Sequence, residues 1–156
     1  MDAMFNNARP WSLDSLNREA RLQLLHRAGQ LERAAAEGGS LPQPLRGKRL
    51  ALLTDDHASA AAQAFVQAAT ELGAHVSHVR ASGTAPGRGA ALLGQLYDAV
   101  ECQGLPAAEV RRLGHDAGVP VFDGVGAAAH PLYRLGEPVQ RQPLRLLQAL
   151  LSATLS

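Results

Sequence analysis

The sequence has few of the residues and segments that mark secreted, membrane or nucleic-acid-binding proteins. It contains a single cysteine, Cys102, so it cannot form an internal disulfide, and a reducing, cytoplasmic location is expected. No basic start leads into an apolar core at the N-terminus, and no apolar run is long enough to span a bilayer. The 15 basic and 14 acidic residues are spread along the chain without a block of one sign. Neither a nucleic acid nor a membrane is therefore predicted as a partner.

Aromatic and metal-binding residues are also sparse. Aromatics make up 4% of the chain, so Trp11 and Tyr133 are interpreted as packing residues rather than stacking platforms. His75 and His78 lie three apart on a predicted strand, so their side chains point to opposite faces and cannot share a metal. Cys102 lies in an apolar run and is predicted to be a buried, inert thiol. The sequence predicts no metal and no cofactor.

Apolar runs and helical periodicities alternate along the rest of the chain. The predicted elements, in chain order, are a helix from Leu13 to Ala35, a strand from Leu50 to Leu53, a helix from Ala58 to Leu72, a strand from His75 to Arg80, a helix from Ala90 to Tyr97, a strand from Asp98 to Cys102, a helix from Pro106 to about Ala117, a strand from Val119 to Phe122 and a helix from Leu144 to Leu155. This order predicts an α/β fold with a four-stranded parallel sheet, doubly wound, with helices on both faces. Residues 1–156 are expected to form one domain, with residues 1–12 flexible and a C-terminal helix over residues 143–155 packing on the domain.

Turn-forming and capping residues set the predicted boundaries. Asp14 or Asn17 is expected to cap the first helix, and Asp55 or Asp56 the second. Gly73 is expected to end the second helix in a left-handed conformation, and a glycine at position 118 to do the same for a later one.

The segment Asp55 to Phe65 has the frame of a phosphate-binding turn between a strand and a helix, but it contains no lysine or arginine. Four further matches occur in order and at suitable spacing, namely Gly47-Lys48, Leu72-Gly73-Ala74, Val119-Pro120-Val121 and His130-Pro131. Together, from about Leu13 to about Pro138, these segments resemble the carbamoyl-phosphate domain of aspartate and ornithine carbamoyltransferases. The fold that this resemblance implies agrees with the fold predicted from the periodicities.

The resemblance also implies which residues have been replaced. The family's turn reads Ser-Thr-Arg-Thr-Arg, and alignment on Phe65 places both arginines on alanines, Ala60 and Ala62. A third family arginine, after the third strand, corresponds to Gln103. In the family's His-Pro-Thr-Gln motif the histidine and the glutamine contact the carbamoyl group. The histidine persists here as His130, whereas Tyr133 stands where the glutamine would be.

Ligands of open parallel sheets bind beyond the carboxyl ends of the strands. The residues predicted to form a vestigial ligand rim there are Asp56, Ser59, Ala60, Ala62, Gln103, His130 and Tyr133. Each hydrogen bond to a charged group contributes roughly 1.5–3 kcal/mol, so losing three arginines removes on the order of 5–9 kcal/mol of phosphate binding. No catalytic residue is therefore expected.

Three functions follow, in order of preference. The first is a catalytically degenerate, carbamoyltransferase-like pseudoenzyme of amino acid metabolism, acting as a non-enzymatic subunit or regulatory partner. By resemblance it would assemble as a homotrimer or join a full-length carbamoyltransferase. Family enzymes carry a second domain that binds the amino acid, whereas this sequence ends soon after His130-Pro131, so no acceptor site is expected. The second function is binding of a different small molecule at the rim, and the third is residual carbamoyltransferase activity.

Overall fold

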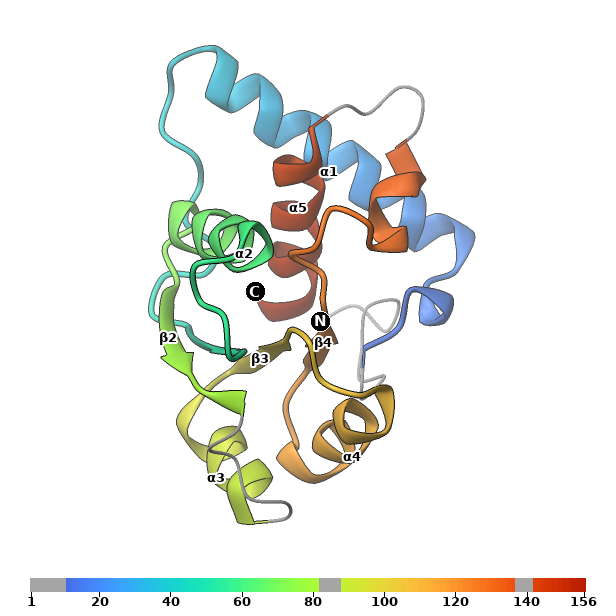
Figure 1. Cartoon of the computed structure of the whole chain (residues 1–156). Coiled ribbons are helices and arrows are strands. Elements are labelled where there is room, and N and C mark those ends of the chain that lie inside the picture. The colour runs from blue at the N-terminus through green and yellow to red at the C-terminus, as the bar shows by residue number, and fades with distance from the viewer. Residues whose placement is uncertain (1–10, 82–87, 137–141) are drawn as a thin grey trace.

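The fold, described by a computed structural model over residues 11–81, 88–136 and 142–156, is a parallel sheet between two layers of helices (Figure 1). The strands are β1 (Arg49–Leu53), β2 (His75–Val79), β3 (Ala99–Cys102) and β4 (Val121–Asp123). They are all parallel and lie in the order β2-β1-β3-β4. The predicted α/β class and the four-stranded parallel sheet are confirmed.

Five α-helices and two short 3-10 helices complete the described chain. They are η2 (Leu13–Ser15), α1 (Arg18–Ala36), α2 (Ala60–Glu71), α3 (Arg88–Leu96), α4 (Ala107–Ala117), η4 (Pro131–Gly136) and α5 (Pro143–Leu155). Helices α1, α2 and α5 cover one face of the sheet, and α3 and α4 cover the other (Figure 1).

The two faces of the sheet have separate cores because neighbouring residues on a strand point in opposite directions. Leu50 and Leu52 of β1 belong to the core beneath α1, α2 and α5, whereas Ala51 and Leu53 belong to the core beneath α3 and α4. All four side chains are at most 1% exposed. A continuous apolar run is therefore required at β1, as is usual for a strand covered by helices on both faces.

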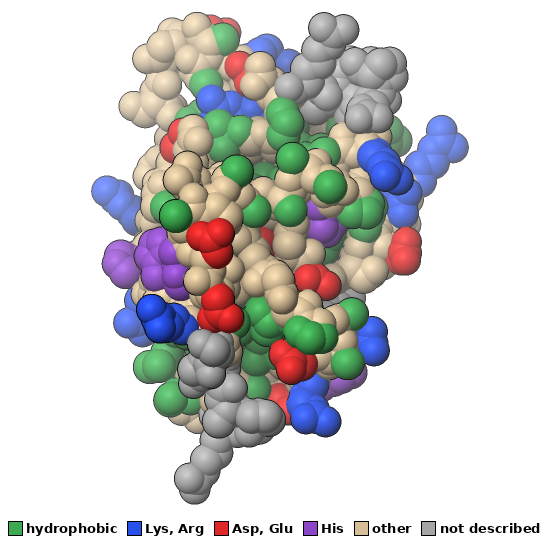
Figure 2. Space-filling view, viewed as in Figure 1, with side chains coloured by type: hydrophobic (Ala, Val, Ile, Leu, Met, Phe, Trp, Pro, Cys, Tyr) green, Lys and Arg blue, Asp and Glu red, His purple; other side chains and the backbone are tan. Residues whose placement is uncertain are grey.

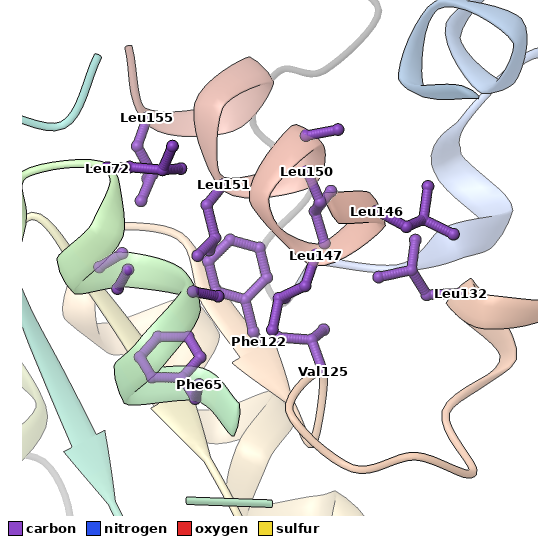
Figure 3. Close-up of a cluster of buried hydrophobic side chains, with 14 of the residues drawn as sticks. Phe65, Leu72, Phe122, Val125, Leu132, Leu146, Leu147, Leu150, Leu151 and Leu155 are labelled. Atoms are coloured by element: carbon purple, nitrogen blue, oxygen red, sulfur yellow. The ribbon is translucent and has the colours of Figure 1, made fainter. Parts of the chain in front are cut away.

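Helix α5 closes the larger of the two cores. Figure 3 shows its leucines packed around Phe122 of β4 and Phe65 of α2, with Leu132 beside Leu146. Pro143 occupies the first turn, where its missing N–H is not needed. Arg145 then joins three helices, since its side chain reaches Glu32 of α1 at 3.4 Å and Glu71 of α2 at 3.0 Å.

The structure corrects the predicted start of the first helix. Leu13–Ser15 is a separate 3-10 turn capped by Ser12. Helix α1 begins five residues later than predicted, at Arg18, because Asn17 Oδ1 accepts the Ala20 N–H at 2.8 Å. Asn17 is thus the cap, and Asp14 is not.

The second helix also starts later than predicted. Ser59 caps α2, with its Oγ accepting the Ala62 N–H at 3.0 Å, so neither Asp55 nor Asp56 is the cap. The predicted helix ends were correct: Gly73 and Gly118 have φ of +100° and +74°.

Residues 1–12 were expected to be flexible, but most of this segment lies outside the described residues. At Trp11 the chain is held against the domain by burial and by a backbone hydrogen bond. Trp11 is 6% exposed, and its backbone N–H donates to Val121 O of β4 at 2.8 Å.

Candidate functional site

In the turn between β1 and α2, the polar side chains form hydrogen bonds with the backbone of the turn itself. Asp56 is exposed, and its Oδ1 accepts the Ala58 N–H at 3.1 Å. Thr54 Oγ1 lies 3.2 Å from the Asp56 N–H, which donates to it. Ser59 Oγ caps α2 by accepting the Ala62 N–H. The protein's own side chains therefore accept backbone N–H groups that could otherwise bind an anion at this helix N-terminus.

The two alanines that stand for the family arginines have different environments. Ala60 is exposed, whereas Ala62 is completely buried among the core side chains beneath α2. Position 62 therefore does not line an open rim, which corrects the sequence-based assignment of that residue.

Gln103, at the end of β3, is 8% exposed and bonded within the protein. Its Nε2 donates to Ala61 O in the first turn of α2 at 3.1 Å, and to Glu101 Oε2 at 3.1 Å. Its Oε1 has no hydrogen-bond partner among the residues that the structure describes. The side chain thus links β3 to α2 across the carboxyl end of the sheet.

The loop after β4 approaches the same turn of α2. A Cβ at Gly126 would lie 2.4 Å from Ala61 O and 2.8 Å from Gln103 Nε2, so only glycine fits there without a shift. The strand ends and the α2 N-terminus, predicted to share one rim, are therefore packed directly against each other.

Glu101 is a buried carboxylate at the centre of this contact, and the sequence analysis missed it. Its oxygens accept the Gly126 N–H at 2.9 Å, the Val125 N–H at 3.2 Å and the Gln103 amide. Burial, together with the charge of Asp123, raises its pKa to about 7 despite these hydrogen bonds. A lone acidic residue in the apolar strand Ala99–Cys102 was the sequence signal that could have identified it.

His130 and Tyr133 are both used for local structure. His130 Nδ1 accepts the Leu132 N–H at 3.0 Å, and its ring lies 6.3 Å from that of Trp11. Burial lowers the pKa of His130, and the nearby Asp123 charge partly offsets this effect. The Tyr133 hydroxyl donates to Val125 O, and burial, with the Glu101 charge, raises its pKa.

The segment after His130 forms only the short 3-10 helix η4. Helix α5 begins 12 residues after Pro131, at Pro143.

A contact between two histidines was also missed. The rings of His57, after β1, and His78, on β2, are 4.7 Å apart between centroids. His57 Nε2 lies 3.3 Å from Leu52 O. Within residues 11–81, 88–136 and 142–156, no group of three or more His, Cys, Asp or Glu side chains could hold a metal. Two imidazoles fall short of the three or four protein ligands that are usual for zinc.

The surface near the rim is acidic rather than basic. Figure 2 shows acidic side chains in the middle of the face that carries the β1–α2 turn, with Lys and Arg side chains around its margin. Asp55, Asp56 and Asp123, which follow or end strands β1 and β4, are all exposed. No helix in the described part of the chain is long and apolar enough to cross a membrane.

Sequence comparison finds relatives among carbamoyltransferases, although no family model matches the chain. The chain is 35% identical over 120 residues to the catabolic ornithine carbamoyltransferase of Burkholderia mallei, covering 73% of this chain and 35% of that protein. It is 34% identical over 131 residues to the catabolic ornithine carbamoyltransferase of Mycoplasma capricolum subsp. capripneumoniae, covering 80% and 41%. The chain thus spans well under half the length of these relatives.

Solved structures show the same fold. The ornithine carbamoyltransferase of Pyrococcus furiosus superposes with a TM-score of 0.65 at 24% identity, covering 72% of this chain and 38% of that one. The catalytic subunit of aspartate transcarbamoylase from M. jannaschii superposes with a TM-score of 0.67 at 18% identity, covering 83% and 44%.

Proposed function

Because the chain is a partial carbamoyltransferase-family domain, we propose that it is a non-catalytic member of that family. In this proposal its rim does not bind carbamoyl phosphate, and the domain acts as a subunit or regulatory partner in an assembly. The partner would be two further copies of the chain or a full-length carbamoyltransferase.

The observation that carries this proposal is the position of Gln103. By the resemblance it stands where the family has an arginine, and both N–H groups of its side chain are used within the protein, donating to Ala61 O and to Glu101 Oε2. Gly126 packs into the same contact. A phosphate at the α2 N-terminus would have to displace the Asp56 and Ser59 side chains, which accept the Ala58 and Ala62 N–H groups.

Charge supports the same conclusion. The segment from Asp55 to Ala62 contains two carboxylates and no lysine or arginine. A partial positive charge at a helix N-terminus contributes only about 0.3–1 kcal/mol at an exposed site. The lost arginine contacts together contribute on the order of 5–9 kcal/mol. The helix end therefore does not compensate for the lost cations.

We expect carbamoyl phosphate to leave the melting temperature of the protein unchanged at concentrations of about 10 mM. A ligand that binds the folded state stabilises it by RT ln(1 + [L]/Kd), so any binding tighter than millimolar would raise the melting temperature. Differential scanning fluorimetry, with inorganic phosphate as a second ligand, makes the measurement. A saturable rise with carbamoyl phosphate would contradict the proposal.

The variant Ala60→Arg tests whether the frame of the site persists. Position 60 is exposed and accepts a long side chain, whereas an arginine at position 62 would disrupt the core. Some phosphate affinity should appear in Ala60→Arg and not in Ala108→Arg, which adds the same charge at an exposed position of α4. Equal behaviour of the two variants would mean that the turn no longer has a phosphate-binding shape.

The second candidate function is binding of a different small molecule at the rim, and the Gln103 Oε1 atom supports it. Gln103 Oε1 is buried and lacks a donor among the described residues, so a ligand that offers an N–H or O–H group would satisfy it. The same melting assay with neutral amides such as acetamide separates the two candidates. A rise that is lost in Gln103→Leu would favour this second function.

A further inference from the structure

A concave site lies away from the rim, between α1, α5 and the loop that joins α1 to β1. It has a volume of about 260 Å³ and is lined by Arg27, Gln30, Leu31, Ala34, Pro42, Pro44 and Ser152. None of these residues belongs to the predicted rim. Figure 1 shows α5 beside α1, with the chain after α1 turning back towards the sheet.

The lining is mainly apolar and holds one charge. Leu31, Ala34, Pro42 and Pro44 supply hydrocarbon surface on both sides of the groove. Among the lining residues that the structure describes, Arg27 is the only charged one, and none is acidic.

The Arg27 guanidinium is held at the groove without a counter-ion. Its Nη1 donates to Ser152 Oγ at 2.6 Å, and the Ser152 side chain is buried, at 3% exposed. Arg27 forms no ion pair with any residue in the described parts of the chain, where the ion pairs of Arg145 are with Glu32 and Glu71. A guanidinium has five N–H donors, so most of them remain available for a carboxylate.

We propose that this groove binds a small aliphatic carboxylate, with the carboxylate on Arg27 and the hydrocarbon chain against Leu31, Ala34 and the two prolines. Charge complementarity selects the anionic head, and the apolar lining selects the tail. Ligand sites commonly measure about 300–1,000 Å³, so a volume of 260 Å³ favours a short ligand.

Amide NMR of the whole chain, titrated with hexanoate, tests the proposal. Saturable shifts are expected at α1 around Arg27 and at α5 around Ser152, with a dissociation constant in the millimolar range, because a ligand of about eight non-hydrogen atoms gains little affinity. Hexanol and hexylammonium, of matched length, should bind at least about threefold more weakly. Binding of either as tight as that of hexanoate would overturn the proposal, as would shifts spread over the whole molecule.

Variants distinguish the contribution of the Arg27 charge to hexanoate binding from the contribution of the apolar groove. Arg27→Gln should weaken hexanoate binding by about three- to tenfold, and Arg27→Lys, which keeps the charge, by less. Arg33→Gln is the matched control, since Arg33 is an exposed arginine of α1 outside the lining. Ala34→Phe should abolish binding by filling the groove. Equal affinities in Arg27→Gln and Arg33→Gln, or unchanged binding in Ala34→Phe with an intact fold, would refute the site.

Discussion

At the scale of single residues, Glu101 has the most unusual environment in the described structure. A buried carboxylate is costly unless it is hydrogen-bonded. Glu101 is fully buried, and two backbone amides and the Gln103 side chain donate to it. These bonds hold the loop after β4 against β3, so the residue fixes the geometry of the rim without contacting solvent.

The raised pKa of Glu101 predicts a pH dependence of stability. Its folded pKa is about 7, compared with the ordinary value of 4.5, so the folded state binds this proton more tightly than the unfolded state does. The free energy of unfolding should therefore fall as the pH rises from about 4.5 to about 7, by on the order of 3 kcal/mol. Glu101→Gln should remove this slope in urea unfolding at pH 5, 6, 7 and 8.

Comparison of variants isolates the contribution of Glu101. His130 acts in the opposite direction, because its lowered pKa makes stability rise with pH as the pH approaches 6.5. The relevant quantity is thus the difference between wild type and variant. Glu109→Gln, at an exposed position of α4, is the control and should keep the wild-type slope. A slope unchanged in Glu101→Gln would show that Glu101 is ionised in the folded protein throughout this range.

At the scale of elements, α3 and α4 meet at a glycine. A Cβ at Gly94 of α3 would lie 1.7 Å from Ala117 O, a backbone atom at the end of α4. Backbone cannot move aside as a flexible side chain can, so the absence of a side chain at position 94 sets the distance between the two helices.

Gly94→Ala should therefore lower the free energy of unfolding by on the order of 1–3 kcal/mol, because the two helices must separate. Gly29→Ala is the matched control within α1, where a Cβ would meet only Arg33 Nη1, at 3.5 Å. That substitution should stabilise the protein by about 0.5–1 kcal/mol, the usual preference for alanine over glycine in a helix. Urea unfolding of both variants makes the comparison, and a loss of similar size in both would count against the close contact.

Local signals predicted most elements, because their causes lie within a few residues of sequence. The buried run at β1, the left-handed glycines after α2 and α4, and Pro143 at the start of α5 all follow from backbone chemistry. The capping residue of α2 did not follow, because Asp55, Asp56 and Ser59 are all good caps. Only the packing of Phe65 and Ala62 into the core fixes the phase of that helix.

The location of the rim at the carboxyl ends of the strands could be predicted from the sequence, but the contacts between its residues could not. Topology alone brings the strand ends together, which is why Gln103 and the β1–α2 turn were predicted to be neighbours. The contacts of Glu101 with Val125 and Gly126 join residues about 25 positions apart, and no periodicity reveals such a contact. The His57–His78 ring contact depends in the same way on strand register, with His78 paired to Leu52.

At the scale of the whole molecule, α5 holds the helical layer together. Arg145 contacts α1 and α2 through Glu32 and Glu71, and Gln148 donates to Ala68 O and to Glu71. Burial opposes ionisation of Glu71, but hydrogen bonds from Gln67, Gln148 and Arg145, together with the Arg145 charge, lower its pKa. One face of the sheet is thus covered by three helices that are linked by both apolar and polar contacts.

The proposed role as a subunit makes a prediction about assembly. Leu92 and Leu96 lie one turn apart on α3 and are 54% and 45% exposed, so they form an apolar stripe that association would cover. Size-exclusion chromatography with light scattering should give the mass of a trimer, and Leu92→Glu with Leu96→Glu should reduce it to that of a monomer. Leu22→Glu, at an equally exposed leucine of α1, should leave the trimer intact. A wild-type monomer at micromolar concentration would exclude the homotrimer, and co-purification with a full-length carbamoyltransferase would then decide whether the domain acts as a subunit at all.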